Sequence, residues 1–453
     1  YEINRCREAL KAESLEVHAL YGDLPVEEQQ RVLAPSPGRK VILSTNVAET
    51  SLTVPGVTAV VDSGLTRQAR VSPWSGLSSL VTIPASQASA AQRMGRAGRL
   101  QAGHCLRLYS KFDFDHRAAF DLPELLRSEL SKSLLDLKCL NVEDLDAFPW
   151  FLKPSPVAME TALSLLKRLG ALDTQGGLTD VGRRMARFPL APRLAKFLLK
   201  VEELASKDSE LLSEACRLAA LISEERAESE DLLEELRRFK PGFESKRLEE
   251  QLLQLLKANS PHPPLLKGGE AKSNPQSPPL KKGGQGGFSE SQELLAKALL
   301  SAFPDRVARV RPLDSSSTRN RSGKVRELLL SSGGMVLAQD NALTRAHEYF
   351  VVVEAQVTTG TNSQVKARSL CPIEVDWLLD LFPEELAEEQ TCEWNAKAER
   401  VEGFKRLKYG QLALDEKPLT PGDLGHEAAA LLYKEALSAG QQAYCDPDEL
   451  AAF

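Results

Sequence analysis

The segment at positions 92–99, Gln-Arg-Met-Gly-Arg-Ala-Gly-Arg, carries side chains suited to contacting phosphate groups. On a helix, Gln92, Arg96 and Arg99 follow one another at four and three residues and therefore share one face. Two planar guanidinium groups with a permanent charge, set side by side, suit a polyanion such as a phosphate chain. The alternative is a solvated basic helix face, which is the ordinary meaning of a charge run.

Two glycines favour the phosphate interpretation over the solvated face. Gly95 and Gly98 form a second stripe, three residues apart, that has no side chains. Because a glycine inside a helix costs about 1 kcal/mol relative to alanine, their presence predicts the close approach of another backbone or of a ligand.

A second polar run lies upstream, at positions 44–53, and is rich in short hydroxyl and amide side chains. Its candidate residues are Thr45, Asn46, Thr50, Ser51 and Thr53. Such groups near the start of a helix, together with backbone N–H groups, can hold phosphates without reading bases. Helix capping is the alternative, because serine and threonine favour caps, but five such residues exceed what one cap needs.

The elements around these residues predict an α/β fold. Strands are expected at 15–20, 40–44 and 57–61, with helices at 1–10 and 26–32 between or before them. This alternation indicates an open, largely parallel sheet. Ligands of such sheets lie at the carboxyl ends of strands, which is where Thr45 and Asn46 fall.

These segments carry a family resemblance. Positions 92–99 resemble motif VI (QRxGRxGR) of superfamily 2 helicases in the DEAH-box form, and positions 44–53 resemble motif V. The block Val-Val-Asp-Ser-Gly at 60–64 follows as the next conserved block of that group does. Downstream, the block Ala-Phe-Pro-Asp-Arg-Val-Ala at 302–308 resembles one in the bacterial HrpB-type helicases and narrows the resemblance to that type.

The resemblance implies roles for the motif VI residues in an ATP-dependent helicase. Arg96 and Arg99 would be arginine fingers facing ATP bound between two RecA-like domains, and Gln92 would position the attacking water or contact the γ-phosphate. The other residues assigned to nucleotide binding are Gly95, Thr53, Asp62 and Arg93. Arg93 lies off the stripe, so a structural role or a place on the interdomain face is also expected for it.

The resemblance also implies contacts to a nucleic acid. These are assigned to Thr45, Asn46, Thr50, Ser51, Arg67 and Trp74. Positions 65–86 predict a hairpin, the expected strand separator, with Trp74 at its tip. Trp74 is placed there either to stack on a base or to pack against a neighbouring domain.

Only half of a helicase is expected in this chain. It contains neither the Walker A pattern GxxxxGK[ST] nor a DEAH motif, and it starts at Tyr1 inside a helical pattern without a methionine. It therefore resembles the C-terminal part of a longer enzyme that moves 3′-to-5′ along single-stranded nucleic acid, with RNA the expected substrate. The ligands of ATP and Mg²⁺ would come mainly from an N-terminal RecA-like domain of the same protein, and this chain alone is expected to be inactive.

Five segments are predicted. Residues 1–108 resemble the second RecA-like domain, 109–190 a winged helix, and 191–258 the helical ratchet bundle. Residues 259–293 are a Pro/Gly-rich insert that cannot bury a core and is expected to be disordered. Residues 294–453 form a β-rich HrpB-type region, OB-like in its strands. Its aromatic residues Trp377, Trp394 and Tyr409 fit stacking platforms or, as favoured, the core.

Composition is compatible with this interpretation. The net charge of −6 over 453 residues conceals a stretch from Gly64 to Lys111 without a single acidic residue. The seven cysteines lack CxxC spacing, which indicates neither zinc nor disulfides and suits a cytoplasmic protein. No apolar run approaches the ~18 residues that a membrane span needs. The sequence shows no carboxylate cluster of the kind that a nuclease or other metal-dependent hydrolase needs. The remaining alternative is a non-catalytic nucleic-acid-binding or partner-docking protein.

Overall fold

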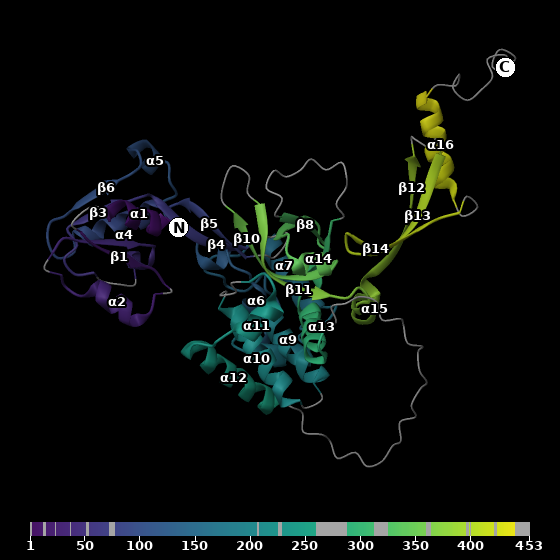
Figure 1. Cartoon of the computed structure of the whole chain (residues 1–453), viewed down its shortest axis with the longest axis horizontal. Coiled ribbons are helices and arrows are strands. Elements are labelled where there is room, and N and C mark those ends of the chain that lie inside the picture. The colour runs from purple at the N-terminus through teal and green to yellow at the C-terminus, as the bar shows by residue number, and fades with distance from the viewer. Residues whose placement is uncertain are drawn as a thin grey trace.

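The computed structural model describes most of the chain, with gaps. The described residues are 2–11, 15–22, 24–36, 38–50, 54–71, 78–205, 208–224, 229–259, 288–311, 325–358, 364–395, 398, 400–420 and 424–439. Figure 1 shows an α/β part, a group of helices with a barrel beside it, and an arm that carries the last described helix.

The α/β part contains parallel strands, as predicted, but they form two separate pairs. Strand β1 (Glu16–Leu20) pairs with β2 (Lys40–Ser44), and β3 (Ala59–Asp62) pairs with β6 (His104–Arg107). The expectation of one open sheet is not met, because no described strand is hydrogen-bonded to both β2 and β3. Consequently Val61 on β3 remains 65% exposed.

Four helices accompany these strands, namely α1 (Glu2–Leu10), α2 (Val26–Leu33), α3 (Val47–Thr50) and α4 (Gln87–Ala97). Helix α2 begins after Pro25 with two glutamates in its first turn and Arg31 in its last, which complements the helix dipole. A small core of Leu20, Leu24 and Val32 joins β1 to α2.

The predicted hairpin is present. Strands β4 (Leu65–Val71) and β5 (Ser78–Pro84) pair antiparallel, with Leu65 opposite Pro84. Its turn at 72–77, and Trp74 with it, lies outside the described residues. The hairpin runs from the α/β part toward the barrel, where β5 lies beside β10 (Figure 1).

The middle of the chain is helical. Its elements are α5 (Lys111–Asp115), η1 (Glu124–Leu126), α6 (Ser131–Cys139), α7 (Pro156–Arg168), α8 (Asp180–Ala186), α9 (Pro192–Leu204), α10 (Ser209–Ser223), α11 (Leu232–Arg238), α12 (Phe243–Asn259) and α13 (Glu290–Ala302). The apolar spacing over 125–140 is typical of one buried helix, but η1 and α6 are separate, and the Glu129 carboxylate between them accepts from the backbone and hydroxyl of Ser131. Between α7 and α8, Leu172 and Leu178 form an antiparallel bridge.

The predicted insert at 259–293 falls largely on residues 260–287, outside the described part of the chain. Its boundaries are too wide, since α12 includes Asn259 and α13 begins at Glu290. Ser289 caps α13 in a capping box with Gln292, a local signal that fixes where this helix begins.

A closed five-stranded barrel follows. After η2 (Pro304–Arg306) come β7 (Val307–Val310), β8 (Val325–Leu330), β9 (Met335–Gln339), α14 (Ala342–Ala346), β10 (Tyr349–Thr358) and β11 (Gln364–Ile373), in the order β10-β11-β9-β8-β7. Over 294–311 the sequence pattern indicates a helix followed by a turn, and this is wrong at its end. Pro304 cannot continue the helix, and the β-branched Val307 and Val310 enter a strand.

The last strands do not belong to the barrel, contrary to expectation. After α15 (Asp376–Leu381) and η3 (Pro383–Glu385), a sheet of its own is formed by β12 (Leu386–Asn395), β13 (Arg400–Tyr409) and β14 (Leu412–Pro418), followed by α16 (His426–Ala439). Cross-strand ion pairs such as Lys405–Glu388 and Lys408–Glu389 occupy this sheet. Charged side chains of this kind suit solvent rather than a barrel interior, and the sheet extends away from the barrel (Figure 1).

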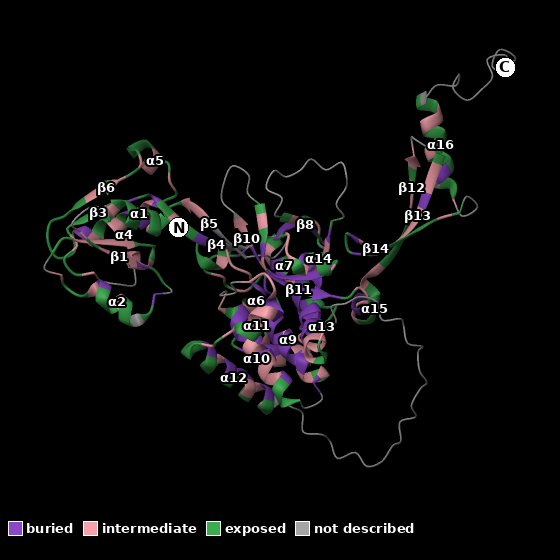
Figure 2. Ribbon diagram, in the orientation of Figure 1, coloured by how far each residue is buried: buried purple, intermediate pink, exposed green. Residues whose placement is uncertain are grey.

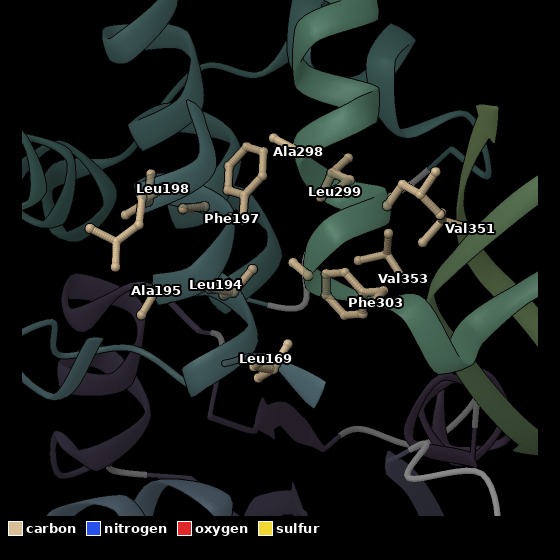
Figure 3. Close-up of a cluster of buried hydrophobic side chains, with 14 of the residues drawn as sticks. Leu169, Leu194, Ala195, Phe197, Leu198, Ala298, Leu299, Phe303, Val351 and Val353 are labelled. Carbon is tan, nitrogen blue, oxygen red and sulfur yellow. The ribbon is translucent and has the colours of Figure 1, made fainter. Parts of the chain in front are cut away.

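One large core unites the helices with the barrel, and buried residues gather there (Figure 2). In Figure 3, Phe197 and Leu198 of α9 and Leu299 of α13 lie in one cluster with Val351 and Val353 of β10. Trp377 and Tyr409 are buried, as favoured by the sequence, whereas Trp394 is half-buried. Among the described helices, none is both long and apolar enough to cross a bilayer.

Candidate functional site

Helix α4 carries two of the three aligned side chains. Its N-cap Ser86 accepts from the backbone N–H of Ser89, and Gly98 caps its C-terminus. Gln92 and Arg96 therefore lie on the helix, but Arg99 lies beyond its end, so the three do not share a helical face. The chain must turn there, because Gly103 returns so close to Ala97 that a Cβ would lie 2.3 Å from the Ala97 carbonyl oxygen.

The two glycines of the motif are open. A Cβ at Gly95 or Gly98 would have no described atom of this chain within 4 Å. No close packing within the described chain therefore accounts for these glycines.

Arg93 is the best anchored side chain of the helix. Its Nε donates to Glu49 at 3.0 Å, while Nη1 donates to Asp62 at 2.9 Å and to the Leu65 carbonyl at 3.0 Å. Its side chain is only 14% exposed. Burial opposes its charge, but the hydrogen bonds to Asp62 and Glu49 outweigh burial and raise the pKa of Arg93. These contacts fix α4 against α3 and against the end of β3.

Asp62 is enclosed at that point. It is 2% exposed and accepts from Arg93, from the Gly64 N–H at 2.9 Å and from the Tyr109 hydroxyl at 2.8 Å. Burial alone would raise its pKa, but these donors lower it. Burial and the bond to Asp62 raise the pKa of Tyr109 to about 12, so Tyr109 remains a donor. Asp62 is therefore an internal acceptor.

The Arg96 side chain contacts the backbone of the polar run at 44–53. Its Nη2 donates to the carbonyl oxygen of Glu49 in α3. Glu49 thus receives Arg93 on its carboxylate and Arg96 on its main chain. The structure accordingly brings the two predicted motifs together at the contact of α3 with α4.

The remaining predicted residues are only partly placed. Thr45 and Asn46 are exposed directly after β2, where the Thr45 N–H donates to Leu20 and Asn46 accepts from Glu49. Arg67 is exposed on β4. The positions of Ser51, Thr53 and Trp74, and the side chain of Thr50, lie outside the described residues.

Three residues that support this site from behind were not singled out from the sequence, namely Glu49, Tyr109 and Arg117. Arg117 donates from Nη1 to the carbonyls of Gly64 at 2.9 Å and Ala85 at 3.3 Å, and from Nη2 to Asp113 at 2.6 Å. Its partners Gly64 and Ala85 lie 53 and 32 residues away, so no local spacing could have indicated it. In the described part of the chain, no group of His, Cys, Asp or Glu is arranged to hold a metal ion.

Comparison with known families defines the class. Residues 2–101 match the helicase conserved C-terminal domain, and residues 162–190 match the winged helix of the helicase associated domain (HA2). The α/β part is thus a RecA-like helicase domain, and a winged helix follows it.

Individual relatives specify the type. The chain is 33% identical over 405 residues to the ATP-dependent RNA helicase HrpB of Escherichia coli (strain K12), covering 88% of this chain and 44% of that protein. It is 41% identical over 208 residues to the ATP-dependent RNA helicase HrpA homolog of Haemophilus influenzae, covering 44% of this chain and 16% of that one. The predicted resemblance to HrpB-type helicases is confirmed.

Solved structures agree. The E. coli DExH-box NTPase HrpB superposes with a TM-score of 0.71 at 30% identity, over 95% of this chain and 48% of that one. A second structure, of the E. coli DEAH/RHA helicase HrpB, gives 0.73 at 31% identity, over 96% and 50%. The chain spans about half the length of the HrpB proteins that it matches.

Proposed function

We propose that this chain is the C-terminal part of an ATP-dependent RNA helicase and supplies the arginines that contact the transferring phosphoryl group of ATP. The observation that carries this proposal is that one arginine of α4 is held by internal contacts while other polar side chains of the helix reach its surface. Arg93 is anchored on Glu49 and Asp62, which fixes the helix, while Gln92 stays exposed and Arg96 half-buried on the same element.

In this proposal Arg96 and Arg99 neutralise the charge that develops on the γ-phosphoryl group, and Gln92 orients the attacking water. Arg99 lies beyond the end of α4 and would reach the phosphate from a second direction. Gly95 permits close approach because a Cβ there is absent. Asp62 and Arg93 act as positioning residues, since all their contacts described above are internal.

ATP with Mg²⁺ is the proposed cofactor, with its remaining ligands on another RecA-like domain of the same protein. Bound there, Mg²⁺ would neutralise phosphate charge. The guanidinium groups on and after α4 suit the triphosphate of ATP, because a planar guanidinium can donate two hydrogen bonds to phosphate oxygens. This chain by itself is proposed to be inactive in hydrolysis.

The nucleic-acid path is proposed along Thr45, Asn46 and Arg67, with Thr50, Ser51 and Trp74 in the same path. Thr45 and Asn46 are exposed at the carboxyl end of β2, and Arg67 is exposed on β4. Such groups hold a backbone without reading sequence. RNA is the proposed substrate and 3′-to-5′ the proposed direction of stepping.

We also propose the segments 1–108, 109–190, 191–258 and 294–453 as the RecA-like, winged-helix, bundle and C-terminal β-rich units. The fold supports this division by its elements, since strands with helices, then helices, then barrel and arm succeed one another. A cytoplasmic location is proposed because the cysteines lack the spacing that would indicate disulfides.

The deciding experiment is the ATPase rate of the full-length protein, with and without single-stranded RNA, compared with its Arg96→Ala variant. Removal of an arginine finger is expected to lower the stimulated rate by roughly 10³-fold or more, with ATP binding retained. Arg31→Ala, on the exposed side of α2, is the matched control and is expected to be unchanged. An unchanged rate in Arg96→Ala removes this residue from the catalytic site. No RNA-stimulated hydrolysis in the unmutated protein supports the non-catalytic binding protein instead.

A further inference from the structure

Two arginines clamp the base of the β4–β5 hairpin. Arg93 of α4 donates to the carbonyl of Leu65, the first residue of β4, at 3.0 Å. Arg117, which follows α5, donates to the carbonyls of Gly64 and Ala85, the residues that flank the two strands. The Ala85 N–H in turn donates to Gly64 at 2.9 Å and closes the base. The hairpin is thus tied to the candidate nucleotide-contacting helix.

The two arginines are joined through Asp62. One carboxylate oxygen of Asp62 accepts from Arg93, and the other accepts from Tyr109. The ring of Tyr109 lies 3.8 Å from the Arg117 guanidinium, a cation–π contact. The Arg117 side chain is only 6% exposed. A continuous chain of contacts therefore runs from α4 across the hairpin base to α5.

The cluster leaves little room for the base to shift. Gly64 has φ +72°, and a Cβ there would lie 2.4 Å from the Tyr109 ring and 2.7 Å from Arg117. Packed interiors of this density transmit displacement instead of absorbing it. The hairpin base is therefore expected to move together with α4.

The rest of the hairpin meets the helical region and the barrel. Arg127 donates from Nη1 to the Ala69 carbonyl of β4 at 3.2 Å. Strand β5 lies beside β10 of the barrel (Figure 1). The hairpin consequently bridges the nucleotide-contacting helix and the barrel.

We propose that Arg117 and Tyr109 are positioning residues that lock the hairpin to α4, so that a nucleotide-driven displacement of α4 moves the hairpin as a rigid lever. This inference rests on the proposed helicase function and adds residues that convert hydrolysis into strand separation. Neither side chain touches ATP in this scheme. Their loss uncouples hydrolysis from unwinding and leaves hydrolysis in place.

The test measures two quantities in the full-length protein: the kcat and KM of RNA-stimulated ATP hydrolysis, and the base pairs unwound per ATP on an RNA duplex with a single-stranded tail. Arg117→Ala is expected to keep kcat within about twofold and to lower the base pairs per ATP by roughly 2- to 30-fold, the range of measured coupling changes. Tyr109→Phe, which keeps the ring but loses the bond to Asp62, is expected to show a smaller loss of the same kind. Arg117→Lys should recover part of the coupling, because an ammonium keeps the charge but cannot reach all three acceptors.

Lys111→Ala is the control, since the Lys111 side chain is 86% exposed and pairs with Asp115 in the same helix. It is expected to hydrolyse and unwind as the unmutated protein does. Unchanged base pairs per ATP in Arg117→Ala overturn the lever. So does a parallel fall of hydrolysis and unwinding in Arg117→Ala, Arg117→Lys and Tyr109→Phe. If the unmutated protein shows no RNA-stimulated hydrolysis, the proposed function fails as well. If the unmutated protein hydrolyses ATP and unwinds the duplex, and the variants unwind as many base pairs per ATP, only the lever is refuted.

Discussion

Arg193 grips Asp305 with both ends of its guanidinium group, Nη1 to Oδ1 at 2.6 Å and Nη2 to Oδ2 at 2.7 Å, across 112 residues of sequence. Nη1 also donates to the carbonyl of Ala302 at 3.3 Å. The pair joins α9 of the helical region to the turn that starts the barrel. It is largely buried, so its two charges depend on one another.

Asp305→Ala is expected to lower the free energy of unfolding by about 3–5 kcal/mol, because it leaves the Arg193 charge buried without its partner. Urea unfolding at pH 7 measures this. Asp146→Ala, which removes an exposed pair with Lys153, should cost less than about 1 kcal/mol. Equal costs for the two variants would contradict the assignment.

The same pair predicts sensitivity to acid. Burial opposes the charge of Asp305, but Arg193 outweighs burial and holds the pKa of Asp305 well below its ordinary value. Stability from a lowered carboxyl pKa is present above the unfolded value of about 3.9 and is lost as the pH falls toward the folded value. The difference in unfolding free energy between the unmutated protein and Asp305→Ala should therefore shrink between pH 5 and pH 2. A constant difference over that range would refute the lowered pKa.

Gly64→Ala is expected to lower the melting temperature through two causes. The left-handed backbone at φ +72° costs a non-glycine residue about 1–2 kcal/mol, and the new Cβ meets Tyr109 and Arg117. Gly56→Ala is the matched control, because Gly56 has φ +74° with nothing within 4 Å of its Cβ position. The excess loss in Gly64→Ala, measured by calorimetry, reports the crowding. Equal losses would mean that Tyr109 and Arg117 move aside freely.

Arg93→Ala and Arg96→Ala are expected to lower the free energy of unfolding by different amounts, although the two residues lie three positions apart. Arg93→Ala leaves Asp62 buried without its cation and should cost about 3–5 kcal/mol. Arg96→Ala removes the donor to the neutral Glu49 carbonyl and should cost less than Arg93→Ala. Chemical denaturation of both variants checks this order. A larger loss in Arg96→Ala would make Arg96 the structural arginine.

Glu230 should make the barrel edge lose stability as the pH rises above the ordinary pKa of a carboxyl group. Its carboxylate accepts from the Gln339 N–H at 3.0 and 3.1 Å and from Asn341 at 3.3 Å, but burial dominates and raises its pKa. A raised carboxyl pKa means that stability is lost as the pH rises through the folded value. Glu230→Gln keeps an acceptor without the charge.

The gain in melting temperature of Glu230→Gln should therefore be larger at pH 8 than at pH 4. Glu234→Gln, at a carboxylate paired with Arg238 nearby, serves as the control. A gain that does not depend on pH would exclude the raised pKa of Glu230 as its cause.

The sequence predicts what local patterns determine. Local patterns located β1, β2, α2 and the hairpin within a few residues. Position 99 illustrates the limit, because the residue types continue the helical spacing while Gly98 and the return of Gly103 end the helix at Ala97.

Long-range partners could not be predicted. Arg93 takes its acceptors from 44 and 31 residues away, and Arg117 takes its acceptors from both ends of a hairpin. Likewise, the residues of β12–β14 favour a strand as strongly as those of the barrel strands do. Only pairing partners assign it to a separate sheet.

The shared core has a consequence for how this architecture can be inherited. A single cluster of buried side chains runs from Leu130 in the helical region, through Phe303, to Leu412 in the arm. A recombination point placed between bundle and barrel would divide that cluster and leave two apolar surfaces facing water. Among the described buried residues, none before Leu130 belongs to that cluster. Gene fusion and domain exchange should therefore have retained residues 130–412 as one heritable block, with the α/β part as the unit that can be exchanged.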